Sequence, residues 1–77
     1  MVATISIQIK PYSIVKNYVQ AGLITVSEGT TIKDLIDSFG ISKYPPLVVR
    51  VNGRISSLDV VLTEGDLIEL IPSILGG

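Results

Sequence analysis

The chain has 77 residues, 47% of them hydrophobic, which allows one small domain with a modest core. Its net charge is −1 and no basic block occurs, so nucleic-acid and membrane-surface partners, which need a concentrated positive patch, are not expected. The absence of Cys and His excludes Cys–His and Ser–His–Asp catalytic arrangements and the usual zinc sites, and it leaves no side chain with an unperturbed pKa near neutrality.

The first predicted element is a strand over residues 4–10. Apolar and polar residues alternate along it, which places three isoleucines on one face: Ile5, Ile7 and Ile9. This period of two is typical of a half-buried strand. Pro11 is expected to end the strand because it lacks a backbone donor.

Residues 13–21 fit either a short helix or a loop. In a helix, one face would carry four residues: Ile14, Val15, Tyr18 and Val19. Gly22 would then terminate the turn. Residues 23–26 read as a second strand, closed by Glu28-Gly29.

The next segment has the signals of an amphipathic helix. Thr31 is a suitable N-cap, and Asp34 supplies a capping-box partner that also favours the positive end of the helix dipole. Gly40 stands where a left-handed terminating residue is expected. Apolar residues fall at helical spacing and form one stripe, which we interpret as core: Ile32, Leu35, Ile36 and Phe39.

The second half of the chain predicts three more strands. Pro45-Pro46 precedes a β-branched strand over residues 47–51. Asn52-Gly53 is the preferred pair for a type I′ hairpin, so a short strand should begin near Arg54. A connection containing Leu58 and Leu62 follows. The turn Glu64-Gly65-Asp66 then leads into a last strand over residues 67–71, which Pro72 should stop.

This order predicts an α+β fold of the β-grasp, ubiquitin-like type, with a mixed sheet of four to five strands wrapped on one main helix. The first and last strands both have core character, as they would if they paired at the centre of the sheet. We expect the folded domain over residues 1–72. A flexible C-terminal tail over residues 73–77 should follow it.

The Gly76-Gly77 pair ends this tail. A terminal pair of glycines also arises by chance, but here it follows the strand that closes the domain. Glycine permits close approaches that a Cβ would block, as a terminus threading a narrow enzyme channel requires. A carboxylate is a poor electrophile, so a partner must activate it, most simply by adenylation with ATP. We therefore expect Gly77 to be the reactive residue, Gly76 its slim neighbour, and the chain itself to be neither an enzyme nor a binder of metal or cofactor.

Two further segments resemble the ubiquitin-like sulfur-carrier superfamily. Residues 28–36 of this chain resemble the strand-to-helix junction of that superfamily. The C-terminal half of the superfamily is matched by Val51-Asn52-Gly53, Leu62, Gly65-Asp66, Ile68, Leu70, Pro72 and Gly76-Gly77. The resemblance covers residues 23–77, whereas residues 1–22 agree in pattern only. It implies a terminal glycine that is adenylated by a ubiquitin-activating-type enzyme, converted to a thiocarboxylate with a sulfur donor protein, and presented to an acceptor enzyme.

The pathway follows less directly from the sequence. The Ile71-Pro72 step resembles the small subunit of molybdopterin synthase more than the thiamine-pathway carrier, whereas Ser73 and Leu75 depart from that pattern. The first expectation is thus molybdenum-cofactor synthesis, with the molybdopterin synthase large subunit as acceptor. The alternatives are thiamine synthesis with a thiazole synthase, tRNA thiolation, a protein modifier, and a passive β-grasp interaction module with accidental glycines.

The last strand also predicts a docking face. Glu69 should point outward with its alternate neighbours, while Ile68 and Leu70 face the helix; strand 47–51 should turn Val48 and Arg50 outward. The opposite register, with Leu67 and Ile71 in the core and Glu69 at the rim, is the alternative. The expected partner-binding residues are Val48, Arg50, Leu67, Glu69, Ile71, Pro72, Ile74 and Leu75.

The remaining polar features are interpreted as structural. Asp59, Glu64 and Asp66 fit turn residues better than a metal cluster, and no phosphate-loop motif occurs. No signal peptide is expected after Met1, and no apolar run approaches the roughly 20 residues that span a bilayer. With the absence of cysteine, these features favour a cytoplasmic protein.

Overall fold

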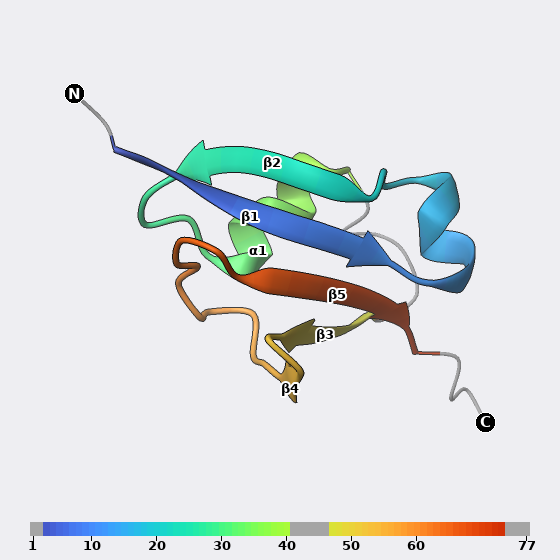
Figure 1. Cartoon of the computed structure of the whole chain (residues 1–77). Coiled ribbons are helices and arrows are strands. Elements are labelled where there is room, and N and C mark those ends of the chain that lie inside the picture. The colour runs from blue at the N-terminus through green and yellow to red at the C-terminus, as the bar shows by residue number, and fades with distance from the viewer. Residues whose placement is uncertain (1–2, 41–46, 74–77) are drawn as a thin grey trace.

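The computed structural model describes residues 3–40 and 47–73. In chain order its elements are β1 (Thr4–Pro11), the 3₁₀ helix η1 (Ser13–Asn17), β2 (Gly22–Ser27), α1 (Ile32–Ser38), β3 (Leu47–Val51), β4 (Arg54–Ile55) and β5 (Leu67–Pro72). The strands form one sheet in the order β2-β1-β5-β3-β4 (Figure 1). β1 and β5 are parallel, whereas the other neighbours are antiparallel. The predicted α+β fold and the pairing of first and last strands are confirmed.

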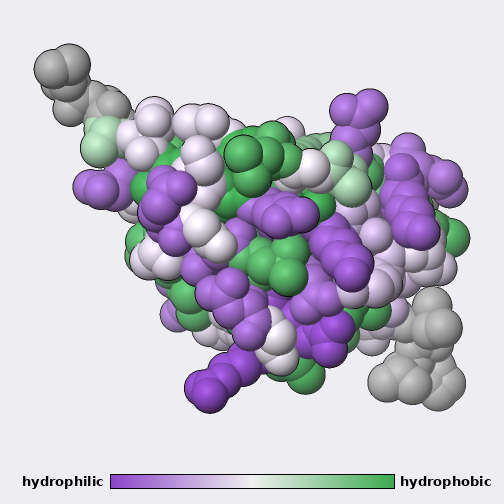
Figure 2. All heavy atoms as spheres, viewed as in Figure 1, coloured by the Kyte–Doolittle hydropathy of each residue, from purple (hydrophilic) through white to green (hydrophobic). Residues whose placement is uncertain are grey.

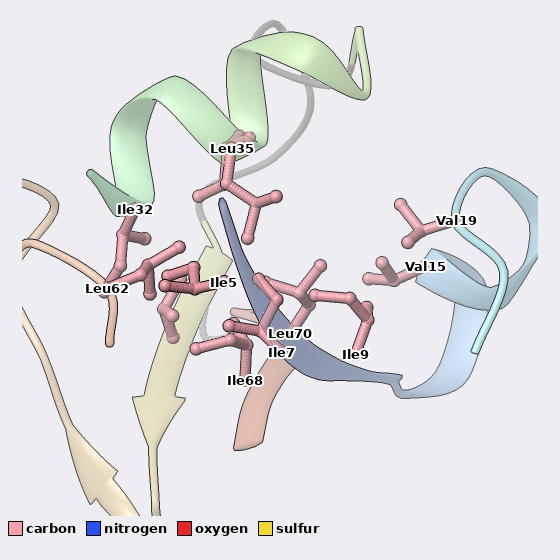
Figure 3. Close-up of a cluster of buried hydrophobic side chains, with 12 residues drawn as sticks. Ile5, Ile7, Ile9, Val15, Val19, Ile32, Leu35, Leu62, Ile68 and Leu70 are labelled. Carbon is pink, nitrogen blue, oxygen red and sulfur yellow. The ribbon is translucent and has the colours of Figure 1, made fainter. Parts of the chain in front are cut away.

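The core lies between one face of the sheet and α1. Side chains from β1, β5 and α1 point toward one another there (Figure 3). The buried set contains Ile5, Ile7, Ile9, Val15, Val19, Ile32, Leu35, Ile36, Val49, Leu62, Ile68 and Leu70. Every other residue of β1 and β5 therefore faces α1, and the intervening residues form the opposite, outer face of the sheet. Within the described ranges, no helix is long and apolar enough to cross a membrane.

The predicted capping of α1 is confirmed. Thr31 Oγ1 accepts a hydrogen bond of 3.1 Å from the Asp34 backbone N–H, and the Thr31 N–H donates to the Asp34 carboxylate at 3.2 Å. The N–H groups of Ile32 and Lys33 donate to loop carbonyls, at 3.1 and 2.9 Å. Since the first backbone donors of a helix have no partner inside it, these bonds anchor the start of α1 to the loop before β5. Gly40 follows the helix with a φ of +74°, as expected for a terminating glycine.

A polar network joins the β3–β4 hairpin to the turn before β5. Asn52 and Gly53 have φ angles of +53° and +88°, which confirms the predicted type I′ turn. The Asn52 amide donates to the Asp66 carboxylate at 2.9 Å and accepts from the Leu67 N–H at 2.9 Å. Burial raises the pKa of Asp66, but hydrogen bonds from the Thr63 backbone, from Asn52 and from the Thr63 hydroxyl outweigh it and hold the pKa below its ordinary value.

The segment after β1 does not form the single apolar helical face that its sequence allows. Val15 and Val19 are buried, but Ile14 and Tyr18 are 43% and 52% exposed. A 3₁₀ helix turns every three residues, so adjacent apolar residues point in different directions and cannot share the broad face of an α-helix. Gly22, expected to terminate the turn, is instead the first residue of β2.

Both prolines predicted to stop strands are themselves the last residues of those strands. Pro11 pairs with Leu70, and Pro72 pairs with Leu47. The ladder continues one step beyond Pro11, because the Tyr12 N–H donates to the Leu70 carbonyl at 2.9 Å. Pro11 is tolerated because its partner Leu70 accepts from the N–H of the next residue, so the ladder to β5 needs no donor from Pro11 itself.

Candidate docking face and C-terminal segment

The segment that carries the predicted reactive residues follows directly from the central strand. β5 ends at Pro72, and Ser73 is the last residue that the structure describes. The predicted site residues Ile74, Leu75, Gly76 and Gly77, and with them the predicted mobility of the tail, lie outside the described residues. What the structure does fix is the point from which this segment starts, since β1 and β3 flank β5 on both sides.

The predicted orientation of β5 is confirmed, and the opposite register is wrong. Ile68 and Leu70 have no exposed surface and pack in the core, whereas Leu67 and Ile71 are only half-buried. On β3, Val49 is buried. Its neighbours, Val48 and Arg50, therefore point to the outer face together with Leu67, Glu69 and Ile71.

Glu69 lies on the outer face but is covered there by other side chains. It is only 6% exposed, because Tyr12 and Arg50 cover it. The Tyr12 hydroxyl donates to its carboxylate, and Arg50 Nη2 forms a salt bridge of 3.0 Å with the same oxygen. The alternation of the strand predicts the face of Glu69 but not this cover, since Tyr12 lies beyond the end of β1. Glu69 is thus a buried anion near the middle of the outer face.

The electrostatics of this triad favour an ionised Glu69. The hydrogen bond from Tyr12 lowers the pKa of Glu69; burial opposes this, but the hydrogen bond and positive charge of Arg50 and the charge of Lys10 lower it further. The net effect is a pKa below the ordinary value for a glutamate. Arg50 Nε is buried without a hydrogen-bond partner, so this guanidinium is only partly satisfied by the fold.

The triad predicts an acid-dependent contribution to stability. Because the pKa of Glu69 is lower in the folded chain than in the unfolded chain, its stabilising effect is present above the unfolded value of about 4.3 and is lost as pH falls through the folded value. We expect the wild type to be more stable than Glu69→Gln at neutral pH, with the difference closing below about pH 4. Urea unfolding of both proteins between pH 2.5 and 7 measures this. A difference that stays constant across the range would contradict the ionised triad.

Sequence reasoning missed two contributors to the outer face. Ile55 pairs with Arg50 across the β3–β4 hairpin, shares its face and is 77% exposed. The two-residue Asn52-Gly53 turn fixes that register, so Ile55 was deducible from the sequence. Lys10 is the other: it pairs with Glu69 across β1 and β5, and its ammonium lies 5.4 Å from the centre of the Tyr12 ring. Figure 2 shows this face, where hydrophobic surface lies among hydrophilic surface.

The acidic turn residues have structural partners. Asp59 accepts from the Ser57 hydroxyl at 2.6 Å, and Glu64 accepts from the Ser6 N–H at 2.9 Å. Asp66 belongs to the network with Asn52 and Thr63. Across residues 3–40 and 47–73, no group of three or more acidic, His or Cys side chains is placed to hold a metal ion.

Comparison with known proteins gives a consistent result. A family model described as the ThiS family matches residues 14–77. No curated protein matches the sequence significantly. Among solved structures, the putative molybdopterin converting factor subunit 1 of Pyrococcus furiosus is similar with a TM-score of 0.76 and 22% identity, over 91% of this chain and 99% of that chain.

Two further structures share the fold. The small archaeal modifier protein 1 of Methanosarcina acetivorans has a TM-score of 0.66 and 17% identity, over 97% of this chain and 99% of that one. A complex of subunits 1 and 2 of the molybdopterin-converting factor from Helicobacter pylori 26695 contains a chain with a TM-score of 0.58 and 16% identity, over 95% of this chain and 100% of that one. Molybdopterin converting factor subunit 1 and small archaeal modifier protein 1 therefore share this fold.

Proposed function

Because the chain belongs to the ThiS family, we propose that it is a sulfur carrier whose reactive group is the C-terminal carboxylate of Gly77. The observation that carries the proposal is the family match, which runs to Gly77 and includes the Gly76-Gly77 pair. The composition agrees with it, since a chain without Cys or His has no thiol nucleophile and no imidazole to activate a hydroxyl. The partner enzymes supply the catalysis, and ATP is their substrate.

The proposed chemistry has two steps. First, a carboxylate oxygen of Gly77 attacks the α-phosphorus of ATP, forming an acyl adenylate and releasing pyrophosphate. Hydrosulfide delivered by a sulfur donor then attacks the carbonyl carbon, and the bond to AMP breaks, with AMP taking the electron pair. The product is a thiocarboxylate, so one sulfur replaces one oxygen. An amine in place of the sulfur nucleophile would give an amide, which is the modifier reaction.

We propose molybdenum-cofactor synthesis as the pathway. The support is the Ile71-Pro72 step and the likeness in fold to a putative molybdopterin converting factor subunit 1 and to a chain of the complex of subunits 1 and 2. The acceptor enzyme would then be the large subunit of molybdopterin synthase, as in the complex of subunits 1 and 2 from Helicobacter pylori. The second candidate is a protein modifier, which the likeness to small archaeal modifier protein 1 favours.

Intact-mass spectrometry tests the carrier function directly. We would incubate the chain with ATP, the adenylating enzyme from the same genome and a sulfide source, and expect a gain of about 16 Da, the replacement of one oxygen by one sulfur. A matched incubation without ATP should give no gain. Loss of the sulfur on adding the molybdopterin synthase large subunit and its substrate would support the molybdenum pathway, whereas amide-linked adducts on other proteins would favour the modifier.

We further propose that the outer face docks the activating and acceptor enzymes in turn. Exposed or half-buried apolar residues surround the Arg50–Glu69 pair there: Val48, Ile55, Leu67 and Ile71. Apolar surface that is contiguous and bordered by polar groups often marks a partner site. The face lies on the strand that leads to the tail, so a bound enzyme would receive the tail nearby.

Leu67→Asp should weaken both enzyme complexes by about tenfold or more, because the substitution places a charge in a desolvated interface. The fold should survive, since Leu67 lies on the outer face and not in the core. Leu58→Asp is the matched control: Leu58 is 47% exposed on the loop that contacts the start of α1. Binding titrations of both variants measure the loss of affinity, and thermal unfolding checks that both are folded. Unchanged binding by a folded Leu67→Asp protein would exclude this docking face.

A further inference from the structure

The fold gathers basic side chains that the sequence keeps apart. Lys10 and Arg50 both pair with Glu69, from opposite sides of β5. Lys16 lies on η1, which follows the end of β1 and contacts β5. We define Lys10, Lys16 and Arg50 as the basic cluster. Lys10 and Arg50 thus lie beside the middle of β5, whereas η1, which carries Lys16, follows the end of β1 that pairs with Leu70, nearer the carboxyl-terminal end of β5 (Figure 1).

The charge of the basic cluster is only partly neutralised within the fold. Glu69 is the one acidic partner that the described residues provide for it. That carboxylate accepts from Tyr12 and Arg50 and offsets one positive charge, so the three cations and one anion leave a formal charge of +2. The Lys10 ammonium lies over the Tyr12 ring, and the Lys16 side chain is exposed.

Acidic residues gather at the other end of the sheet. Glu28 lies in the turn after β2, and Glu64 and Asp66 lie in the turn before β5. Hydrogen bonds place the latter turn beside the start of β1, since Glu64 accepts from the Ser6 N–H and Gly65 donates to the Ser6 carbonyl. The chain as a whole carries −1, yet the end from which the tail departs is basic. Lys33 at the start of α1 and Arg54 on β4 offset part of this acidic charge, but among the groups named here the balance is basic toward the tail and acidic toward the start of β5.

From this polarity, and resting on the proposed function, we propose that the basic cluster recognises a carboxylate-bearing rim around the channel of the activating enzyme that receives the tail. Opposite charges at the tail end and the channel mouth would orient the encounter, so that the tail approaches first. Charge complementarity of this kind acts mainly on the rate of association and weakens with salt. The acidic end would disfavour the reversed approach.

The test compares two double variants with the same change in net charge. Lys10→Gln/Lys16→Gln removes charge from the basic cluster, whereas Lys33→Gln/Arg54→Gln removes it from α1 and from the edge strand β4. Arg50 is left intact because its loss would strand the buried Glu69. Stopped-flow association with the activating enzyme is measured at low salt and at 0.5 M salt. We expect about a tenfold slower association for the first variant at low salt, an effect within about twofold for the second, and convergence at high salt.

The outcomes distinguish a failure of the proposed role of the basic cluster from a failure of the proposed carrier function. Equal slowing of both variants, or none in the first, would overturn the role of the cluster, and urea unfolding checks that both variants are folded. At saturating concentration the first variant should still gain sulfur, so a failure of the carrier function would appear instead as no mass gain in the wild type. Tight binding of tRNA by the wild type that is lost in the first variant would assign the cluster to RNA and also overturn the proposal.

Discussion

Deletion of Gly77 should abolish the gain of sulfur. The truncated chain still ends in a glycine carboxylate, on Gly76, so its chemistry is unchanged. Its reach is shorter by one residue, which is about 3.3–3.6 Å of extended chain. Because reacting atoms must approach within about 3–3.5 Å, a shortfall of one residue withdraws the carboxylate from the α-phosphate while the folded domain stays docked.

Intact-mass spectrometry after incubation with ATP, the activating enzyme and sulfide measures this effect. The control is Gly77→Ala, which keeps the length of the chain and adds only a methyl group; it should still gain sulfur, but more slowly, because a channel fitted to glycine is crowded by a Cβ. The truncated protein should also bind the activating enzyme about as well as the wild type does if the outer face provides the docking energy. Sulfur on the truncated chain would contradict a reactive Gly77.

The second large effect is on stability. Leu35→Ala should lower the free energy of unfolding by about 2–5 kcal/mol, through lost transfer free energy and the cavity left behind. Leu35 is 2% exposed and belongs, with Ile32, to the face of α1 that covers the sheet (Figure 3). A domain of this size has only a few kcal/mol in reserve, so the variant should be largely unfolded at moderate temperature.

Two comparisons make this measurement specific. Lys33→Ala changes an exposed residue of the same helix and should alter stability by no more than about 0.5 kcal/mol. Removal of Gly76 and Gly77, which follow the last strand, should cost only a few tenths of a kcal/mol. Urea denaturation of all three proteins gives the values. A large loss of stability on removing the two glycines would mean that the tail packs against the domain.

Most of the fold could be predicted because local signals agreed with one another. The alternating isoleucines of β1, the capping box of Thr31 and Asp34, and the Asn52-Gly53 turn each have a short-range physical cause, and each is present in the structure. The structure of the segment after β1 could not be predicted in the same way. Ile14 and Tyr18 fit a helical period in the sequence, but in the structure both are exposed. Periodicity does not distinguish an α-helix from a 3₁₀ turn over so few residues.

The candidate site was predictable only in part. The alternation of β5 gave the correct outer face for Leu67, Glu69 and Ile71, since side chains on a strand have a strict period of two. The burial of Glu69 depends on Tyr12, which lies 57 positions away in the sequence and outside any regular element, so no local pattern reports their contact. The basic cluster could not be predicted for the same reason. Its cations are brought together only by the pairing of β1, β5 and β3, and no run of charged residues in the sequence marks them.

The position of β5 at the centre of the sheet also has a mechanical consequence. An enzyme that draws the C-terminal segment into a channel exerts a pull along β5, which is held by β1 on one side and by β3 on the other. Traction along the strand shears both ladders, so the load is distributed over many hydrogen bonds at once and these cannot open one after another. An edge strand such as β4, pulled away from its single neighbour, would peel bond by bond. The proposed carrier would therefore resist unravelling when an enzyme pulls on its C-terminal end.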